Sequence, residues 1–327
     1  MQKYYDCPRV LREFLTYHET IKGQSQRTIS EYYLDLRMFL RFMKLMREGR
    51  SLNVAFEDVD IRDIDLDFIA GITTSDVYEF LSWLANDRTA DPDAPASERG
   101  ISASSRARKL SALKSFYKFL TVRTKQLDEN PVADLEYPKL RRSLPRYLTL
   151  EQSAALLNAV SGPNEKRDYA ILMLFLNCGI RRSELVGLNI SDVYDDRIRV
   201  VGKGNKERIV YLNEACKSAL AAYLLVRARD ATNIKDKDKN ALFISRLGRR
   251  ISIKTVQWLV YKYLDKAGLS YKHFSTHKLR HTAATLMYQE GGVDVLTLKE
   301  ILGHSELNTT QIYTHVSDRR LEEAVDS

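Results

Sequence analysis

The sequence is poor in cysteine and has no long apolar run. Its three cysteines, Cys7, Cys178 and Cys216, are too few and too scattered for a disulfide framework or a cysteine-rich zinc site. No uninterrupted apolar run approaches the roughly 20 residues that a membrane-spanning helix needs. The segment Met1–Asp6 lacks the apolar core of a signal peptide. We therefore expect a cytoplasmic protein that does not cross a membrane.

Positive charge is in modest excess. Lysine and arginine number 51 against 43 aspartates and glutamates, which gives a formal net charge of +8 and a pI near 9.2. Such an excess is compatible with nucleic-acid binding, but it also serves solubility alone. The chain has 327 residues, of which 44% are hydrophobic. This length and composition favour two domains with ordinary packed cores, and we find no internal repeat or low-complexity tract.

Apolar spacing predicts helices in the N-terminal part of the chain. The clearest helix begins after a cap at Ser25 or Thr28, and its apolar stripe consists of Ile29, Tyr32, Leu36, Phe39, Leu40 and Met43. A second helix is expected over Ser104–Leu120. A shorter one, capped by Thr74, is expected from residue 75 to residue 84.

Prolines interrupt this pattern twice. Residues 85–100 contain two prolines and are expected to form an exposed loop. Between residues 124 and 148 three prolines prevent a long helix, and four cations are interleaved with them: Lys139, Arg141, Arg142 and Arg146. We interpret 124–148 as an extended basic linker, which is either a solvated spacer or a segment that crosses a DNA backbone. The predicted domains are then 1–123 and 149–327.

The second domain is predicted to be mainly α-helical with one β-hairpin. It begins with a capping box, Thr149–Gln152. The expected helices are Glu151–Val160, Lys166–Leu176, Ser183–Leu188, Glu214–Arg229, Ile253–Ala267, His277–Gln289 and Val295–Leu302. The β-branched runs Arg197–Val201 and Arg208–Leu212 flank a glycine-containing turn and predict the hairpin.

This second domain also carries an ordered set of polar residues. They are Arg181, Lys203, His277, Arg280, His304 and Tyr313. Cations can stabilise the charge that develops on a phosphate under attack, a phenol can supply the nucleophile, and a lysine or histidine can move protons. No metal-binding pattern and no nucleotide-binding loop accompany the set. We therefore hypothesise an enzyme that breaks and rejoins DNA strands without a metal or a cofactor.

Taken singly, each residue has an ordinary explanation. Arg181 and Glu184 lie three apart and can form a simple surface ion pair. Lys203 lies between two glycines at a turn, where most lysines are solvated. His304 follows a glycine at an expected helix end, where it can be a capping residue, and Tyr313 is one of 18 tyrosines. The order and spacing of the whole set carry the hypothesis.

The spacing of His277 and His281 also suggests zinc, which we reject. The run lacks the glutamate of a His-Glu-x-x-His site, and Arg280 would place a cation on nearly the same helix face. A hydrogen-bonded, partly buried His281 is the simpler explanation. Cys178 lies in an apolar stretch without an obvious base, so we interpret it as a packing residue.

The complete set resembles the tyrosine site-specific recombinases of the phage-integrase family, and most closely the Xer type. The run Gly179–Leu185 resembles the first-arginine motif, although Cys178 departs from the more frequent threonine. The run Gly202–Arg208 is similar to the family's hairpin, His277–His281 to its His-x-x-Arg motif, and Leu302–Ser305 with Thr309–Tyr313 to its nucleophile segment. The N-terminal helices resemble a SAM-like core-binding domain, so the resemblance implies the family's two-domain architecture across the chain.

The resemblance also implies roles. Tyr313 would attack the scissile phosphate and form a 3′-phosphotyrosyl link, while Arg181 and Arg280 would hold the non-bridging oxygens. Lys203 would protonate the leaving 5′ hydroxyl. His277 and His304 would assist proton transfer, and Glu184 would orient Arg181. Candidates for DNA contact are Arg27, Arg106, Lys114, Lys139, Arg142, Lys206, Arg208, Arg249 and Lys278.

The implied partner is double-stranded DNA with paired inverted half-sites. DNA would be clamped between the two domains by a homo-tetramer, or by a hetero-tetramer with a related recombinase, and the segment 318–327 would dock on a neighbouring protomer. The task would be chromosome-dimer resolution or movement of a mobile element. Two alternatives stay open: DNA relaxation of the type IB topoisomerase kind, and a DNA-binding protein without catalysis.

Overall fold

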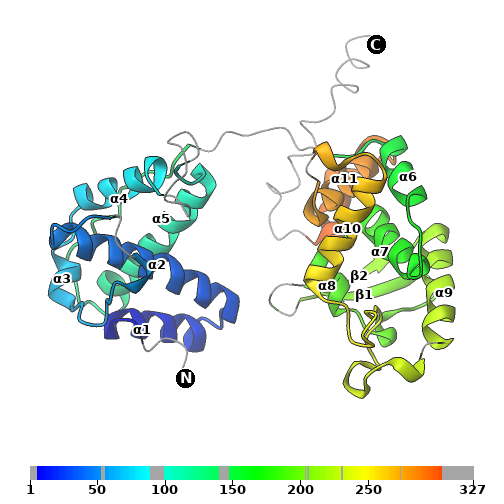
Figure 1. Ribbon diagram of the computed structural model, residues 1–327, viewed down its shortest axis with the longest axis horizontal. Coiled ribbons are helices and arrows are strands. Elements are labelled where there is room, and N and C mark those ends of the chain that lie inside the picture. Colours follow the sequence, from blue (N-terminus) through cyan, green and yellow to red (C-terminus); the bar gives the residue numbers. More distant parts are fainter. Residues whose placement is uncertain are drawn as a thin grey trace, which may run out of the picture. The chain divides into compact units, whose positions relative to one another are not determined.

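The computed structural model divides the chain into two compact units, residues 1–142 and 143–327 (Figure 1). It describes residues 6–52, 56–88, 99–139, 147–202, 204, 206–229, 231–272 and 274–303. Both units are mainly helical, and a two-stranded sheet lies in the second, as the sequence predicted. Within the described ranges, no helix combines the length and the apolar character needed to span a membrane.

The first unit packs its helices around one apolar core. The helices are α1 (Arg9–Thr16), α2 (Gln26–Arg47), α3 (Leu66–Ala70), α4 (Thr74–Asn86) and α5 (Ala103–Lys118). Turns of π-helix extend α1 through Tyr17–Ile21 and α5 through Phe119–Arg123. The predicted apolar stripe of α2 faces the core: Ile29, Leu36, Phe39 and Leu40 are fully buried.

The three expected helices of this unit are present, but two of their caps differ from the prediction. Ser25, one of the two predicted caps of α2, accepts a hydrogen bond from the Thr28 amide through its hydroxyl. Thr73, rather than Thr74, caps α4 in a capping box, and Ser102, rather than Ser104, caps α5. Neighbouring hydroxyl residues have similar capping propensity, so tertiary packing decides which of them is used. The loop expected at residues 85–100 begins later, because α4 continues to Asn86, and residues 89–98 lie outside the described part.

The first half of the predicted linker belongs to the first unit. Leu127, Val132 and Leu135 are buried in its core, and the Pro131 carbonyl accepts a hydrogen bond from the Thr74 hydroxyl at 2.9 Å. The segment up to Leu135 is therefore packed rather than an extended spacer, because its apolar side chains enter the core of the first unit. Lys139 is exposed, while residues 140–146, including Arg142, are outside the described residues.

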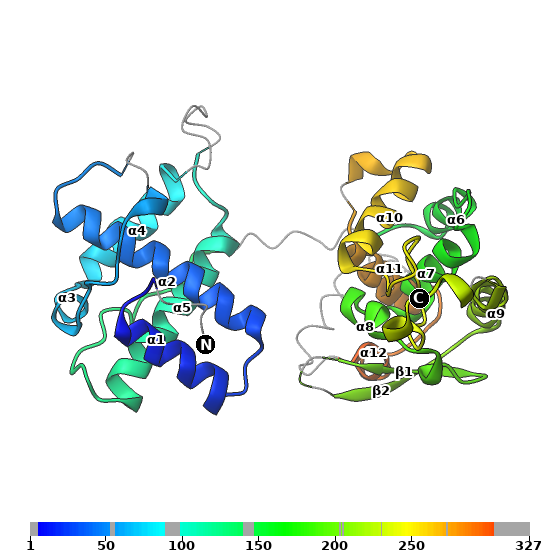
Figure 2. The ribbon, with the colours of Figure 1, turned by 60° about the horizontal axis from the view of Figure 1, so that its bottom comes forward.

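The second unit surrounds the buried helix α7 (Glu165–Cys178). Its other helices are α6 (Leu150–Asn158), α8 (Arg182–Gly187), α9 (Glu214–Arg229), α10 (Ile253–Lys266), α11 (Thr276–Gln289) and α12 (Val295–Leu302). The predicted capping box, in which Thr149 and Gln152 bond reciprocally, begins α6. Strands β1 (Arg197–Val201) and β2 (Glu207–Tyr211) pair antiparallel, with Val200 opposite Arg208. Figure 2 shows this hairpin at one edge of the unit, beside α8 and α12.

A small apolar cluster supports α12. Leu298 and Leu302 of α12 pack with Ala284 of α11, and all three side chains are fully buried. The helix ends at Gly303, which adopts a left-handed conformation with φ of 63°. The end of α12 is thereby held near the hairpin and near the loop that follows α7.

Candidate active site

Arg181 is positioned by the tight turn between α7 and α8. Gly179 ends α7 in a left-handed conformation with φ of 56°, and a Cβ at this position would lie 2.8 Å from the Leu302 Cδ2 atom. Only glycine satisfies both the backbone angle and this close approach. The chain then enters α8 with Arg181 as its N-terminal cap residue, and the Arg181 amide donates to the Glu184 carboxylate at 2.8 Å.

Glu184 is the buried centre of a charged network. Its carboxylate accepts from Arg181 Nη1 at 2.8 Å and from Arg208 Nη1 and Nη2 at 2.8 and 2.9 Å, and its side chain is only 1% exposed. Burial would raise the pKa of this carboxyl, but the hydrogen bonds from Arg208 and Arg181 and the charge of Arg208 outweigh burial and lower the pKa to about 2. The expected pairing of Glu184 with Arg181 is present, and the carboxylate stays ionised at neutral pH.

Arg280 lies nearby on α11. Its side chain is buried, with Nη1 donating to the Gly179 carbonyl and Nη2 to the Leu302 carbonyl, both at 2.6 Å. Arg181 Nη2 donates to the next carbonyl, that of Gly303, at 3.1 Å. The two arginines predicted to bind phosphate therefore meet at the C-terminal end of α12, where a helix presents partial negative charge.

His277 and His281 contact each other one turn apart on α11. Their Nε2 atoms are 3.2 Å apart and their rings meet edge to face. Burial, followed by the charges of Arg280 and Arg181, lowers the pKa of His277. Burial, followed by His277 and Arg280, lowers the pKa of His281 to about 4. Both imidazoles are neutral at pH 7, and the expectation of a hydrogen-bonded, partly buried His281 agrees with the structure.

Three predicted catalytic residues lie outside the described part of the chain: Lys203, His304 and Tyr313. Their described neighbours are close to the arginine cluster. A Cβ on Gly202 would lie 3.3 Å from Glu184 Oε1, and Gly303 borders both Arg181 and Arg208. The structure thus brings together Arg181, Glu184 and Arg280. It contains no group of three or more potential metal ligands among the residues it describes.

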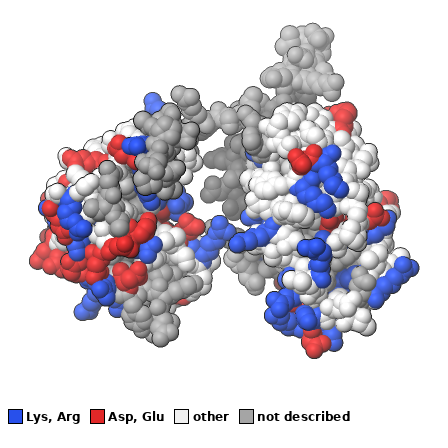
Figure 3. Space-filling view, viewed as in Figure 1, with Lys and Arg blue, Asp and Glu red and all other residues white. Residues whose placement is uncertain are grey.

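The candidate DNA contacts have different surroundings. Arg27, Lys139, Lys206 and Arg249 are exposed. Arg106 donates to the Ile101 carbonyl, Lys114 donates to the Ala133 carbonyl, and Lys278 lies over the Phe274 ring. On the face shown in Figure 3, Lys and Arg side chains predominate over the second unit, whereas Asp and Glu are more prominent over the first.

Arg208 and Arg250 have structural partners that sequence reasoning did not identify. Arg208, one of the candidates for DNA contact, directs its guanidinium at Glu184 and has a side chain 15% exposed. The two-residue period of a strand contained the signal, since Arg208 shares the inward face of β2 with Val210. Arg250, which lies shortly before α10, donates to the Val186 and Leu188 carbonyls.

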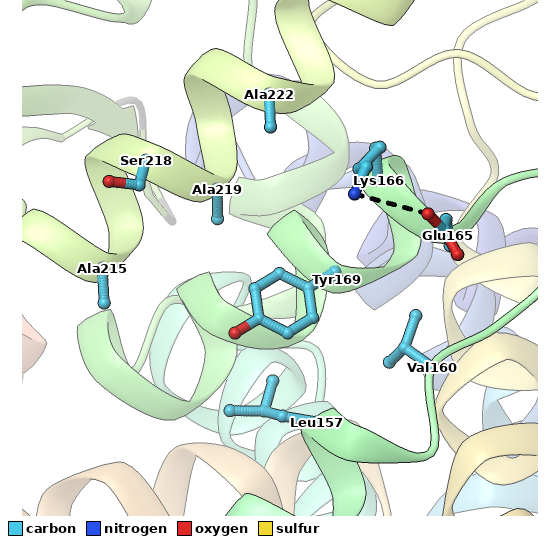
Figure 4. Close-up of a pocket in the computed structure, with 9 residues that line it drawn as sticks. All are labelled: Leu157, Val160, Glu165, Lys166, Tyr169, Ala215, Ser218, Ala219 and Ala222. Carbon is cyan, nitrogen blue, oxygen red and sulfur yellow. Dashed lines mark ion pairs between the residues drawn. The ribbon is translucent and has the colours of Figure 1, made fainter.

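Two further features lie apart from this cluster. Cys178 is buried with its Sγ atom 3.9 Å from that of Cys216, so it packs inside the unit as expected. A hollow of about 420 Å³ lies between α6, α7 and α9, lined by apolar and small side chains with one ion pair, Lys166–Glu165, at its edge (Figure 4). It contains none of the predicted catalytic residues.

Comparison with known proteins matches most of the chain to one family. The phage integrase family matches residues 146–320, and its N-terminal SAM-like domain matches residues 11–126. The chain is 49% identical to the tyrosine recombinase XerC of Caldanaerobacter subterraneus subsp. tengcongensis, over 98% of this chain and 86% of that protein. It is 33% identical to the tyrosine recombinase XerD of Halalkalibacterium halodurans, over 95% and 94% of the two chains.

A solved structure supports the same fold. The recombinase XerH bound to palindromic difH substrate, in a post-cleavage complex, superposes with a TM-score of 0.68 at 22% identity. The alignment covers 99% of this chain and 97% of that one. The helical first unit and the hairpin-containing second unit therefore each have a fold already seen in that protein.

Proposed function

The chain belongs to the phage integrase family as a Xer-type tyrosine recombinase, an enzyme of site-specific DNA recombination, and from this premise we propose how its own residues perform the reaction. The proposed catalytic set is Arg181, Lys203, His277, Arg280, His304 and Tyr313. Tyr313 attacks the scissile phosphorus, the bond to the 5′ oxygen breaks, and a 3′-phosphotyrosyl link forms. The 5′ hydroxyl of a second strand then displaces the tyrosine, so the energy of the phosphodiester is conserved.

The observation that carries the proposal is the convergence of Arg181 and Arg280 on one end of α12. They come from positions about a hundred residues apart in the chain, yet they donate to adjacent carbonyls at 3.1 and 2.6 Å. Guanidinium groups fixed in this way suit the binding of two non-bridging phosphate oxygens. Cations placed before the reaction stabilise the transition state without having to reorganise.

Proton transfer is assigned to the remaining groups. Lys203, which lies in the sequence between β1 and β2, protonates the leaving 5′ oxygen. His277 is neutral at pH 7 because burial and nearby arginines lower its pKa, so it can accept a proton or donate one hydrogen bond. His304 directly follows Gly303 in the sequence and completes the phosphate contacts.

The proposed partner is double-stranded DNA in the cytoplasm, bound at paired inverted half-sites. Both units bind the DNA, and four protomers, either identical or shared with a related recombinase, act on two duplexes. The XerC and XerD relatives support this, as does the structure of XerH bound to palindromic difH substrate. Segment 318–327, outside the described residues, docks on a neighbouring protomer in this proposal.

The test is covalent-adduct formation on a nicked suicide substrate. The full chain should yield a protein–DNA adduct that persists in denaturing gels, and Tyr313→Phe should bind the same DNA but yield none. Adduct formation by Tyr313→Phe would exclude Tyr313 as the nucleophile. A full chain that binds half-site DNA without forming an adduct would be a binding protein. Exchange of strands between two labelled duplexes distinguishes recombination from relaxation by a monomer.

A further inference from the structure

Arg208 shows an arrangement that the proposed reaction does not yet use. It lies on β2 opposite Val200, and its three guanidinium nitrogens all donate to protein acceptors. Nη1 and Nη2 bond to the two oxygens of Glu184, and Nε donates to the Ile301 carbonyl at 3.3 Å. A guanidinium directed in this way at a buried carboxylate and a helix end is suited to holding neighbouring groups rather than to contacting DNA.

We propose that Arg208 is a positioning residue for strand cleavage, which fixes Glu184 on one side and the end of α12 on the other. This inference rests on the proposed function of Arg181 and His304. Through Glu184, Arg208 sets the orientation of Arg181. Through the Ile301 carbonyl it holds the backbone that leads into His304.

The first part of the argument concerns Glu184. Two of its four hydrogen bonds come from Arg208, and the other two come from the amide and the guanidinium of Arg181. If Arg208 were removed, burial would favour the protonated form of Glu184. A neutral acid accepts more weakly from a guanidinium than a carboxylate does, so Arg181 would lose part of its fixed orientation.

The second part concerns the C-terminal end of α12. Its last carbonyls are each bound by one arginine: Ile301 by Arg208, Leu302 by Arg280 and Gly303 by Arg181. A helix C-terminus carries partial negative charge and favours such cations. Arg208 is the member of this trio that is not assigned to the phosphate. It can therefore keep the helix end in place while the other two bind substrate.

The side chain of Arg208 also packs closely against Gly303, at the end of α12. A Cβ at Gly303 would lie 2.8 Å from the Arg208 Cδ atom and 3.1 Å from its Nε atom. The arginine stem thus lies directly against the backbone before His304. A displacement of about 1 Å in a catalytic group can lower the rate on the order of a hundredfold. Loss of the contact between Arg208 and Gly303 would therefore slow strand cleavage.

The experiment compares Arg208→Gln with Arg199→Gln in the full chain. Arg199 is a matched control, because it lies on the paired strand β1 and donates through Nε and Nη2 to the buried carboxylate of Asp192 at 3.0 and 2.7 Å. Both variants lose an arginine–carboxylate pair on the same hairpin. Of these two arginines, Arg208 bonds to Glu184 and α12, whereas Arg199 pairs with Asp192 and Glu207. Arg208→Lys is a second variant that keeps the charge without the two-pronged geometry.

Single-turnover adduct formation at saturating DNA is the main readout. We expect Arg208→Gln to slow it by about tenfold to a hundredfold, Arg208→Lys to lie between, and Arg199→Gln to match the wild type. The salt dependence of DNA affinity should not change, whereas a lost phosphate contact would flatten its slope by about one. The acidic limb of the rate–pH profile of Arg208→Gln should move to higher pH, because Glu184 becomes easier to protonate.

The outcomes are distinct. If Arg208→Gln forms adduct as fast as Arg199→Gln, the inference is overturned. A flattened salt slope with an unchanged rate at saturation would overturn it too, in favour of a direct DNA contact. If Arg208→Gln is too unstable to assay, Arg208→Lys decides by the same comparison. A wild-type chain that forms no adduct would instead contradict the proposed function itself.

Discussion

Replacement of Glu184 by glutamine tests the charged network through stability. In the folded chain the pKa of Glu184 falls from its ordinary value of 4.5 to about 2. Since each pKa unit is worth about 1.4 kcal/mol, this carboxylate contributes about 3 kcal/mol at pH 7. The value agrees with the roughly 3–5 kcal/mol lost when one partner of a buried ion pair is removed. Glu184→Gln should therefore destabilise the second unit by about 3 kcal/mol at pH 7.

The effect of pH on this difference has a definite sign. Because the folded pKa of Glu184 lies below the unfolded one, its stabilisation is complete above about pH 4.5 and is lost as the pH falls through about 2. The gap between wild type and Glu184→Gln should accordingly shrink as the pH is lowered through this window. Any pH dependence shared by both proteins cancels in the comparison.

Native-state hydrogen exchange is the appropriate assay, since the chain divides into two compact units and exchange reports the stability of each one separately. Peptides from α8 and the hairpin report on the second unit, and peptides from α2 serve as an internal reference. Glu207→Gln is the matched control, because Glu207 lies on β2 next to Arg208, the partner of Glu184, but has a side chain 53% exposed, so its loss should change stability by less than about 0.5 kcal/mol. A Glu184→Gln variant as stable as Glu207→Gln at pH 7, or a gap that persists at pH 2, would refute the reasoning.

Three further predictions concern other residues. Lys139→Ala and Arg142→Ala should weaken DNA binding and reduce its salt slope by about one while sparing adduct formation at saturating DNA, and an unchanged slope would argue that this segment does not touch DNA. The folded state favours neutral His281, whose pKa is lowered from 6.5 to about 4, so the stability of the wild type should fall as the pH drops from 6.5 to 4. Measured by thermal unfolding, His281→Gln should lose less stability than the wild type between pH 7 and pH 4. Gly303→Ala should destabilise the end of α12 by roughly 1–2 kcal/mol, because its φ is 63°, and exchange in α12 that matches the wild type would contradict this.

Strong apolar periodicity allowed most helices to be predicted from the sequence. The bounds of α9 and α12 agree with the expected ones, and the i, i+3 spacing of Arg181 and Glu184 correctly indicated their contact. The short helices α1 and α3 were not expected, because a few residues contain too little periodic signal.

Contacts between distant segments could not be predicted in the same way. Nothing local marks Leu127, Val132 and Leu135 as core residues, because their burial depends on helices of the first unit. The hydrogen bond from Arg208 to Glu184 also joins residues 24 positions apart, whereas the local sequence shows only a basic residue beside a glycine-containing turn. Sequence patterns specify which face of an element is inward, but tertiary packing decides what that face meets.

Leu302 links the apolar cluster under α12 to Arg280, one of the two arginines proposed to bind the phosphate. Its side chain fills the cluster with Leu298 and Ala284, while its carbonyl accepts from Arg280. A smaller side chain at residue 298 or 302 would loosen the helix whose terminal oxygens hold the guanidinium groups. Substitutions at residues that do not contact DNA can therefore give folded variants with poor cleavage. A screen for cleavage-defective variants should recover apolar positions on α12 as well as charged residues.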